Sequence, residues 1–461
     1  LCLAPLALVL CLVWLWGVDV LFWDEWIIWA KVLERLDAGT LGLWDLFAQQ
    51  NEQRNASARL VGLALMPLFR LNRYPEFLLN IGLASANAML LTVIARRAIL
   101  ARSQSPTPPA PGQDIPRYLP PVFWALSLSA MQWQVFTVGI NNAIMLPITC
   151  LLAGIALLTG RQAGPGRLLV VLGIGLAGSF HFVNGLFFWI CLLPLCWASA
   201  PRGRRALHLA AWLLTAGLAW GGYFHGYVKP GHHPSLGFAL THPLAFTAFF
   251  LAWLGGALSS DRNLAPLAVA CGAVGIIWLG LFLVRNRAIL QTEARSLFPG
   301  CLPWACLLGF ALASGLATSV GRAGFGLPQA LQSRYAAFAG LFWASLAGLA
   351  ALAPPERPGS TLRDPLSRRA SRNLALALLA VFLLSTVLSS IVLRNRVARM
   401  EGARAELFRL RDDDALAKIF PDPAWLKDHL KGFFDRRLGA YREIGQLADY
   451  PRLDVPAVGA V

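Results

Sequence analysis

The stretch that decides the fold class is polar and lies close to the start of the chain. Residues 22–60 read FWDEWIIWAKVLERLDAGTLGLWDLFAQQNEQRNASARL, an acidic and aromatic segment between two strongly apolar ones. Asp24 and Glu25 follow the first apolar run directly and are flanked by tryptophans. Carboxylates beside a membrane span need a structural or functional reason, because charged groups are costly in lipid. The stretch therefore predicts an extramembrane loop that the remaining chain holds against a bilayer.

The composition of the whole chain indicates a membrane protein. Of its 461 residues, 57% are hydrophobic and only 14% are charged, whereas a soluble domain has about a quarter of its residues charged. The net charge of +16 arises from arginines in short loops between apolar runs. Positive-inside topology explains this pattern better than a nucleic-acid partner does. The eight cysteines form no CxxC pair, so we expect no zinc site, no disulfide framework and no cofactor, and no residue pattern supports a divalent metal.

Apolar runs long enough to cross a bilayer recur along the chain and predict an all-α polytopic bundle. A spanning helix needs about 20 apolar residues, and by this measure the chain has about eleven spans. The run 168–198 is interrupted at His181 and Asn184, so it predicts a tight hairpin of short or tilted helices. The segment 243–258 predicts a re-entrant or interfacial helix, because a full span there would put the arginines of 357–372 outside. The other spans are expected at 1–18, 76–95, 119–137, 143–160, 206–223, 264–284, 299–318, 335–353 and 373–393.

The arginine-rich loops set the expected orientation. Arginines gather after the spans at 76–95, 143–160, 264–284 and 335–353, which places the N-terminus inside and the opening loop, 19–75, outside. This predicts a transmembrane domain over 1–393, with amphipathic helices in the outer loop, and a small extracytoplasmic helical module over 394–461. The bias toward Ala, Leu and Arg points to the inner membrane of a bacterium, with the opening loop facing the periplasm.

The opening loop has the pattern of an amphipathic helix. Trp26, Trp29 and Leu33 recur at helical spacing, which predicts a helix lying in the membrane interface with its tryptophans in the aromatic belt. Asp24 could then be only the N-cap of this helix, with Glu25 stabilised by the helix dipole. This interpretation is compatible with catalysis, because a capped carboxylate is also a positioned one.

Further polar residues fall on the same outer side. Glu52 and Arg54 form either a surface ion pair or part of a cavity shared with the first acidic cluster. His181 at a helix end is either structural or catalytic. Arg322 and Arg334 lie between two spans on the side otherwise poor in arginine. Two guanidiniums there suit a phosphate at headgroup depth, and the alternative is that they are snorkelling anchors.

The paired acids after the first span, the roughly eleven spans and the basic residues near the outer interface resemble the GT-C superfamily, the integral-membrane glycosyltransferases that use polyprenyl-phosphate sugars, so residues 1–393 are expected to form a GT-C-like bundle. Four segments resemble, more narrowly, a bacterial subgroup of it. The resemblance covers the organisation of residues 20–400, although few residues carry it. One position departs from the subgroup: Gln53 stands where a His is usual. A His could transfer a proton, whereas a Gln can only hydrogen-bond, so Asp24 becomes the more favoured acid–base residue. The four segments are Asp24-Glu25-Trp26, Gln49 to Arg54, Gln132 to Asn142, and Gly321 to Tyr335.

The resemblance implies an inverting transfer of a sugar from a polyprenyl-phosphate donor to an extracytoplasmic lipid, polysaccharide or protein. Asp24 or Glu25 would act as the general base on the acceptor hydroxyl, and basic side chains would stabilise the departing lipid phosphate. The residues expected to bind the substrate or its phosphate are Glu52, Arg54, His181, Arg322, Arg334 and Tyr335.

Two other classes of function stay open. In a transporter or lipid flippase the carboxylates would be ion or proton sites, but such charges usually lie near the bilayer midplane. Here the acids lie in a loop, which favours an enzyme. The second alternative is a non-catalytic assembly factor with a GT-C-like fold, which the departure at Gln53 leaves open.

Overall fold

The chain is helical throughout the part that the structure describes. The computed structural model describes residues 2–103, 115–160, 162–231, 234–235, 237–258, 265–292, 294–352 and 368–446. Within these ranges it has helices and one isolated backbone bridge but no strand, so the expected all-α class is confirmed. The helices long and apolar enough to cross a membrane are α5 (Tyr74–Ser103), α8 (Asn142–Leu158) together with the turn η2 (Gly139–Asn141) before it, α15 (Ala265–Thr292), α16 (Ala294–Arg322) and α18 (Arg368–Glu406).

The other expected spans form shorter or interrupted helices. Residues 119–137 are divided into α6 (Leu119–Ser127), η1 (Ala130–Gln132) and α7 (Trp133–Thr137). The interruption is local, because the Ser129 hydroxyl accepts a hydrogen bond from the Met131 backbone and starts η1.

The run 168–198 forms the expected hairpin. Its helices are α9 (Pro165–Ser179), η3 (Val183–Leu186), α10 (Phe187–Cys191) and α11 (Leu193–Ser199). The other helices of the bundle are α1 (Leu3–Trp16), α12 (Arg205–Phe224) and α17 (Ala336–Ala351).

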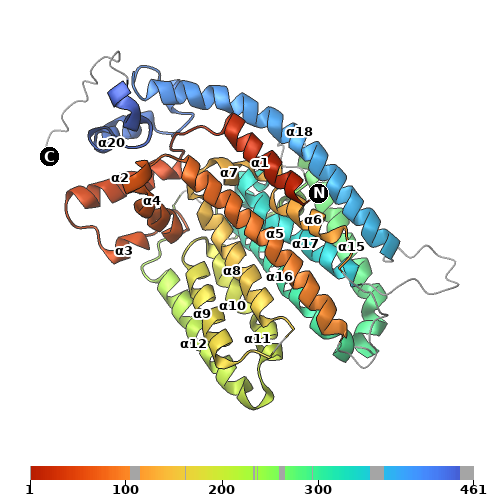
Figure 1. Cartoon of the computed structure of the whole chain (residues 1–461). Coiled ribbons are helices and arrows are strands. Elements are labelled where there is room, and N and C mark those ends of the chain that lie inside the picture. The colour runs from red at the N-terminus through yellow and green to blue at the C-terminus, as the bar shows by residue number, and fades with distance from the viewer. Residues whose placement is uncertain are drawn as a thin grey trace.

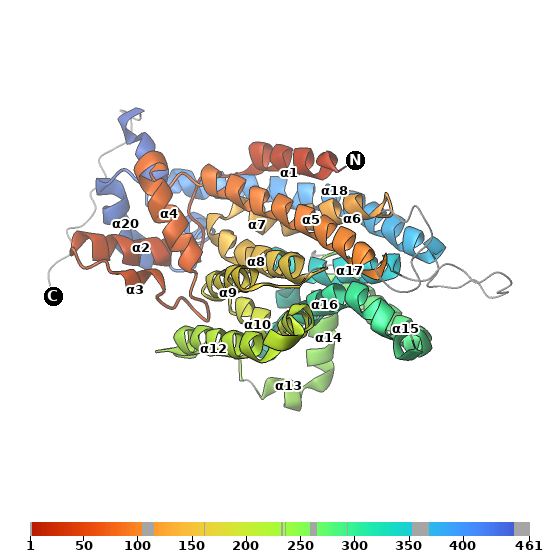
Figure 2. The same ribbon diagram turned by 60° about the horizontal axis from the view of Figure 1, so that its bottom comes forward.

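The bundle is organised around α5, α8, α16 and α17 (Figure 1). Almost every residue of α17 is buried, which its many small side chains allow, because alanine and glycine let neighbouring helices approach closely. Gly348, for example, lies against the Trp304 ring, where a Cβ would come within 2.4 Å of it. Figure 2 shows α1 and α18 along one side of this bundle and α12 along the opposite side.

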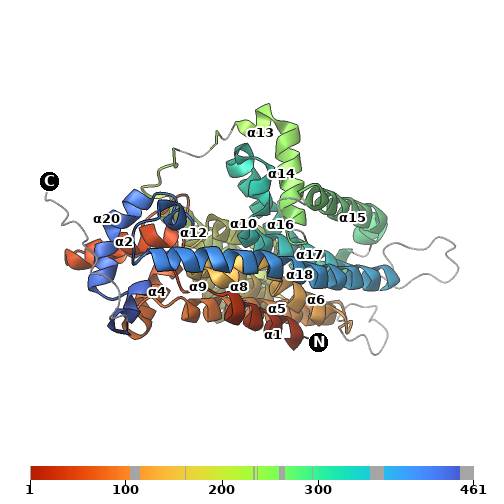
Figure 3. The same cartoon turned by 90° about the horizontal axis from the view of Figure 1, so that it is seen from above.

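The segment expected to be re-entrant or interfacial forms α14 (Pro243–Gly255), which follows the single turn α13 (Phe238–Thr241). Thirteen residues of helix are about 20 Å long, which is less than the roughly 30 Å of the hydrocarbon core. The helix packs closely on α15 (Figure 3). Gly255 lies against the Ala268 carbonyl and Gly272 against the Leu251 carbonyl, so a side chain at either glycine would clash with backbone.

A second hydrophobic core lies at one end of the bundle, outside the long helices (Figure 1). It joins the opening loop to the C-terminal segment: the ring centroids of Trp26 and Phe433 are 5.1 Å apart, and the Trp23 N–H donates to the Ile419 carbonyl at 2.8 Å. The helices that build it are α2 (Asp24–Asp37), α4 (Ala56–Phe69), the end of α18, α19 (Asp413–Leu416), α20 (Pro423–Asp435) and η9 (Gly439–Gln446), and the short helix α3 (Leu43–Leu46) packs beside α4 without a residue in this core.

The apolar face of α2 therefore differs from the expected membrane-interface helix. Trp26 and Trp29 are 2% and 0% exposed, and they are covered by protein instead of lying in an aromatic belt. The reason is that α20 has an apolar stripe of its own, formed by Leu426, Leu430 and Phe433, and Phe433 packs on Trp26, while the Trp29 ring lies against Gly62 of α4. The helical period of α2 was predicted correctly, but its partner was wrong.

The long helix α18 connects the membrane bundle to this second core. It runs along the length of the bundle in Figures 1 and 3 and continues past residue 393 to Glu406. The boundary expected between residues 393 and 394 thus falls inside a helix, and Met400, Ala403 and Leu407 already belong to the second core. The opening loop and the C-terminal segment lie at the same end of the molecule.

Candidate functional site

The turn Gln49–Arg54 is the point where several segments that are distant in sequence meet. It is closed by mutual backbone hydrogen bonds between Gln50 and Gln53, of 2.8 and 2.9 Å. Asn51 adopts a φ of 51°, a left-handed conformation that asparagine tolerates better than most residues. The side chains of this turn then reach outward to four other parts of the chain.

One edge of the turn is fastened to the outer end of α12. The Gln49 amide exchanges two hydrogen bonds with the Val228 backbone, of 2.6 and 2.9 Å. The Arg54 guanidinium donates to the carbonyls of Phe47, Tyr223 and His225 at 2.5–3.1 Å. These bonds occupy the guanidinium with backbone carbonyls. Arg54 therefore holds the loops together, and its geometry does not favour the expected contact with substrate.

The opposite edge is fastened to the hairpin turn at His181. The Gln53 side chain accepts a hydrogen bond from the Val183 N–H at 2.6 Å, and the His181 Nδ1 accepts one from the Ser57 N–H at 3.0 Å. Burial lowers the pKa of His181 to about 4, so this imidazole is neutral near pH 7. The ring also hydrogen-bonds the Ala177 backbone, so its contacts with two backbone groups favour the structural interpretation.

Glu52, at the tip of the turn, meets Arg322 and Asp24. Glu52 forms an ion pair with Arg322 at the end of α16, and both side chains are less than one-fifth exposed. Asn51 donates from Nδ2 to the Asp24 carboxylate at 3.2 Å. Arg322 is also within electrostatic range of Asp24 and Tyr335. The two polar clusters of the opening loop are thus brought together, as the sequence indicated, and Arg322 joins them from a distant segment.

Asp24 and Glu25 have different surroundings although they are adjacent. Glu25 is 1% exposed and accepts hydrogen bonds from Arg73 Nη2 at 2.7 Å, from the Phe22 N–H at 2.8 Å and from the Ile140 N–H at 3.1 Å. Asp24 is half-buried, with Asn51 as its hydrogen-bond donor. Of the two expected bases, only Asp24 has room to contact a substrate.

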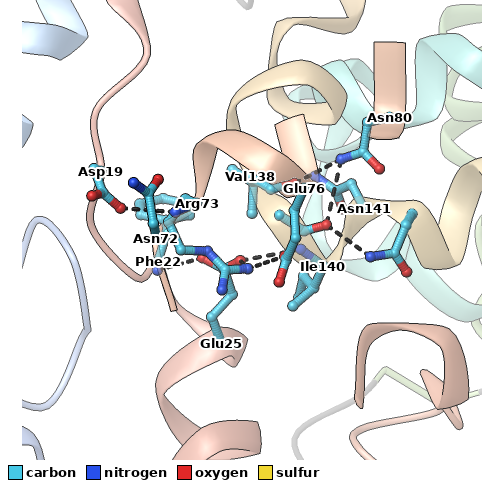
Figure 4. Close-up of polar contacts among 12 residues, drawn as sticks. Asp19, Phe22, Glu25, Asn72, Arg73, Glu76, Asn80, Val138, Ile140 and Asn141 are labelled. Carbon is cyan, nitrogen blue, oxygen red and sulfur yellow. Dashed lines mark hydrogen bonds and ion pairs between the residues drawn. The ribbon is translucent and has the colours of Figure 1, made fainter. Parts of the chain in front are cut away.

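Arg73 is the centre of a buried ionic network that sequence reasoning missed. Figure 4 shows it between Glu25 and Glu76, with its backbone N–H donating to Asp19 at 2.9 Å. Burial lowers the pKa of Arg73, but the three carboxylates outweigh it and the pKa rises above its ordinary value. The available signal was the Arg-x-x-Glu spacing just before an apolar run, which puts both side chains on one helix face.

A second cationic group lies beside the site, around α7. The Arg334 guanidinium is 5.6 Å from the ring centre of Tyr335, and its backbone N–H donates to the Gln134 side chain at 3.2 Å. Its Nε is buried without a hydrogen-bond partner in the described part of the chain. Arg396 of α18 lies between the rings of Phe22 and Trp133, 4.7 Å from each. The sequence does not distinguish Arg396, because it is one of several arginines at the end of the last expected span.

No group of three or more His, Cys, Asp and Glu side chains is placed to hold a metal ion in the described ranges. Comparison of the chain with protein-family models, with curated proteins and with solved structures finds no match. The site therefore has to be interpreted from its own geometry. Among the described residues it consists of one half-buried carboxylate, one ion pair and one guanidinium without an acidic partner, all at one end of an apolar helix bundle.

Proposed function

We propose that this protein transfers a sugar from a polyprenyl-phosphate donor to an extracytoplasmic acceptor, as the resemblance to the GT-C superfamily implies, at an active site formed by Asp24, Glu52, Arg322 and Arg334. The observation that carries the proposal is the convergence of three distant segments on one end of the bundle. There the half-buried Asp24 is within electrostatic range of Arg322. Arg334 lies beside Tyr335, which is itself within range of Arg322, and the Arg334 Nε has no hydrogen-bond partner among the described residues. A base and a phosphate-binding cation are the two groups that this reaction requires.

Asp24 is the general base in this proposal. It takes the proton from the acceptor hydroxyl as that oxygen attacks the anomeric carbon from the face opposite the phosphate. The bond between the anomeric carbon and the phosphate oxygen breaks, and polyprenyl phosphate leaves as the anion. Asn51 orients the carboxylate by donating to it. Glu25 takes no part in the chemistry, because its three hydrogen bonds hold it in the buried network.

Arg334 binds the departing phosphate, and Arg322 orients Glu52. The two arginines were equivalent in the sequence, but Arg322 is paired with a carboxylate whereas Arg334 is not. A free guanidinium can form two parallel hydrogen bonds to a phosphate, while a paired one must first give up its partner. Tyr335, next to Arg334 and within range of Arg322, completes this side of the site.

The membrane setting belongs to the same proposal. About eleven spans, an inner-membrane location in a bacterium and a periplasm-facing site would place the lipid phosphate at headgroup depth beside Arg334. The five long apolar helices and the common position of the opening loop and the C-terminal segment are consistent with this arrangement.

The test is sugar transfer from a panel of radiolabelled polyprenyl-phosphate sugars in proteoliposomes, with bacterial envelope lipids and glycans as acceptors. The wild type should consume one donor, and Asp24→Asn should not, although it folds normally. Glu34→Gln is the matched control, because Glu34 lies on the same helix but is largely exposed and pairs only with His429. Transfer that persists in Asp24→Asn would exclude the proposed base.

The two alternatives predict other outcomes in the same assay. A flippase would move a labelled lipid between leaflets without consuming it. An assembly factor would do neither, and it would keep its cellular role in Asp24→Asn. The double substitution of both acids is not a clean test, because loss of the Glu25 carboxylate would leave the buried Arg73 poorly paired.

A further inference from the structure

A row of buried polar side chains extends from the outer site into the membrane bundle. Glu76, Asn80 and Asn87 lie on the face of α5 that packs on α8, and each is at most 3% exposed. The first and last of these positions are about 16 Å apart along the helix, which is about half the thickness of the hydrocarbon core. On the α8 side the row is joined by Asn142, which is fully buried. We call these four residues and Arg73 the polar seam.

The seam is continuous at Gly139. The Gly139 carbonyl accepts hydrogen bonds from the side-chain amides of Asn80, at 3.4 Å, and Asn142, at 3.1 Å. A Cβ at Gly139 would lie within 2.0 Å of both the Glu76 carboxylate and the Arg73 guanidinium. The glycine therefore allows the ionic network of Figure 4 to touch the backbone that the asparagines bind.

The seam has both acceptors and donors without partners. The Oδ1 atoms of Asn80, Asn87 and Asn142 have no hydrogen-bond donor in the described chain, and the Nε and Nη1 atoms of Arg73 have no acceptor there. Buried polar groups are almost always satisfied by protein or by ordered water. A metal cation could satisfy only the oxygens, and an anion could satisfy only the guanidinium. Water is the one small ligand that serves both.

The inner end of the seam has space for such a ligand. Asn87 lines a cavity of about 20 Å³ together with Ser127 and Gln132. A single water molecule needs about 10–15 Å³ of such volume and two to four polar partners. The cavity meets both conditions, and the unpartnered Oδ1 belongs to a residue that is 3% exposed.

Beyond Asn87 the same helix face becomes apolar. Leu91, Ile94 and Ala98 are buried in the core, where α8 contributes Leu152 and Ile155. The next polar side chain of α5 that reaches α8 is Arg97, whose guanidinium donates to the Ala156 carbonyl, and the buried Leu91 and Ile94 separate it from Asn87. A polar path for protons or ions would have to extend across the whole bilayer, whereas this one stops about halfway.

We propose that the polar seam between α5 and α8 binds ordered water and is closed at Leu91. Water molecules bind the three asparagine oxygens and the Arg73 guanidinium, and the innermost one occupies the cavity at Asn87. The seam is thus a hydrated support for the outer site. It is not a transport path, and this inference does not depend on the glycosyltransferase proposal.

The test is a cryo-electron microscopy map of the protein in lipid nanodiscs at a resolution that shows ordered water. We expect density within hydrogen-bond distance of Asn87 Oδ1 in the wild type, in sodium and in N-methylglucamine buffers alike. The density at the cavity should disappear in Asn87→Leu and remain in Thr92→Val. The latter is the matched control, because the Thr92 hydroxyl bonds the Ala88 carbonyl of its own helix, at 2.9 Å.

Two results would overturn the inference. A map that shows other ordered water but an empty cavity in the wild type would mean that the seam is dry, and density that requires sodium would mean that the ligand is a cation. Closure is measured separately in proteoliposomes with an imposed pH gradient. Wild-type vesicles should dissipate the gradient no faster than empty ones, and a faster leak that Asn87→Leu abolishes would show a path instead of a closed seam.

Discussion

The Glu25 carboxylate lies 2.7 Å from the Arg73 guanidinium, and both side chains are 1% exposed. Glu25 is thus part of the fold, whereas the side chain of its neighbour Asp24 remains partly exposed. The two adjacent acids have equivalent positions in the sequence, but the first turn of α2 points their side chains in different directions. One carboxylate is therefore buried and the other is partly exposed.

Replacement of Glu25 should therefore affect stability more than replacement of Asp24. Glu25→Gln leaves the buried Arg73 with one carboxylate fewer and should lower the free energy of unfolding by about 3–5 kcal/mol, the usual effect of breaking a buried ion pair. Asp24→Asn should lower it by about 1 kcal/mol or less, through the helix dipole. Thermal unfolding in the same detergent measures both, and equal effects would contradict the difference in roles.

Replacement of Arg334 should weaken donor binding without unfolding the protein. A hydrogen bond to a charged group contributes about 1.5–3 kcal/mol, so Arg334→Gln should weaken binding of polyprenyl phosphate at least about tenfold. Arg334→Lys keeps the charge but loses the two parallel hydrogen bonds, so its affinity should lie between those of the wild type and Arg334→Gln. Native mass spectrometry with lipid titration measures these affinities. Lys427→Gln is the control, because Lys427 pairs with Asp413 in the C-terminal segment. Unchanged affinity in Arg334→Gln would exclude this arginine from the phosphate site.

His181 should make the protein less stable in mild acid. Its pKa is about 4 in the folded chain and 6.5 when unperturbed, so the unfolded state binds the extra proton first as the pH falls. Stability is therefore unaffected above about pH 6.5, decreases between pH 6.5 and 4, and has lost roughly 3 kcal/mol below that window. His181→Asn keeps an acceptor for the Ser57 N–H but cannot titrate, so the loss assigned to His181 should be absent from its pH profile. Parallel profiles for the two proteins would rule out the histidine as the cause.

The second core should depend on the contact between α2 and α20. Phe433→Ala removes a buried ring that packs on Trp26 and should destabilise this end of the molecule by about 3–5 kcal/mol. Limited proteolysis should then cut the C-terminal segment faster, since local opening exposes it. Trp44→Ala is the control, because Trp44 is 83% exposed and its loss should change stability by less than about 0.5 kcal/mol. Equal proteolysis rates in the two variants would argue against the docked arrangement.

Some features of this protein were determined by the sequence alone. Apolar runs of about 20 residues predicted the five long helices, and the interruptions at His181 and Asn184 predicted the hairpin of 165–199. Local patterns suffice here because a helix in lipid satisfies its own backbone hydrogen bonds. The period of Trp26, Trp29 and Leu33 likewise predicted α2 and its buried face.

Only the tertiary structure decided what those faces and charges contact. The helical period shows that Trp26 lies on an apolar face that must be buried, but lipid and another helix are equally apolar surroundings. Phe433 contacts Trp26 because α18 ends beside α2 and brings the C-terminal segment there. Adjacent carboxylates have the same chemistry until one of them is buried against a guanidinium that is 48 residues away in sequence. The separate roles of Asp24 and Glu25, and of Arg322 and Arg334, follow from long-range contacts. Such contacts depend on how the helices pack, and a pattern of neighbouring residues does not record that packing.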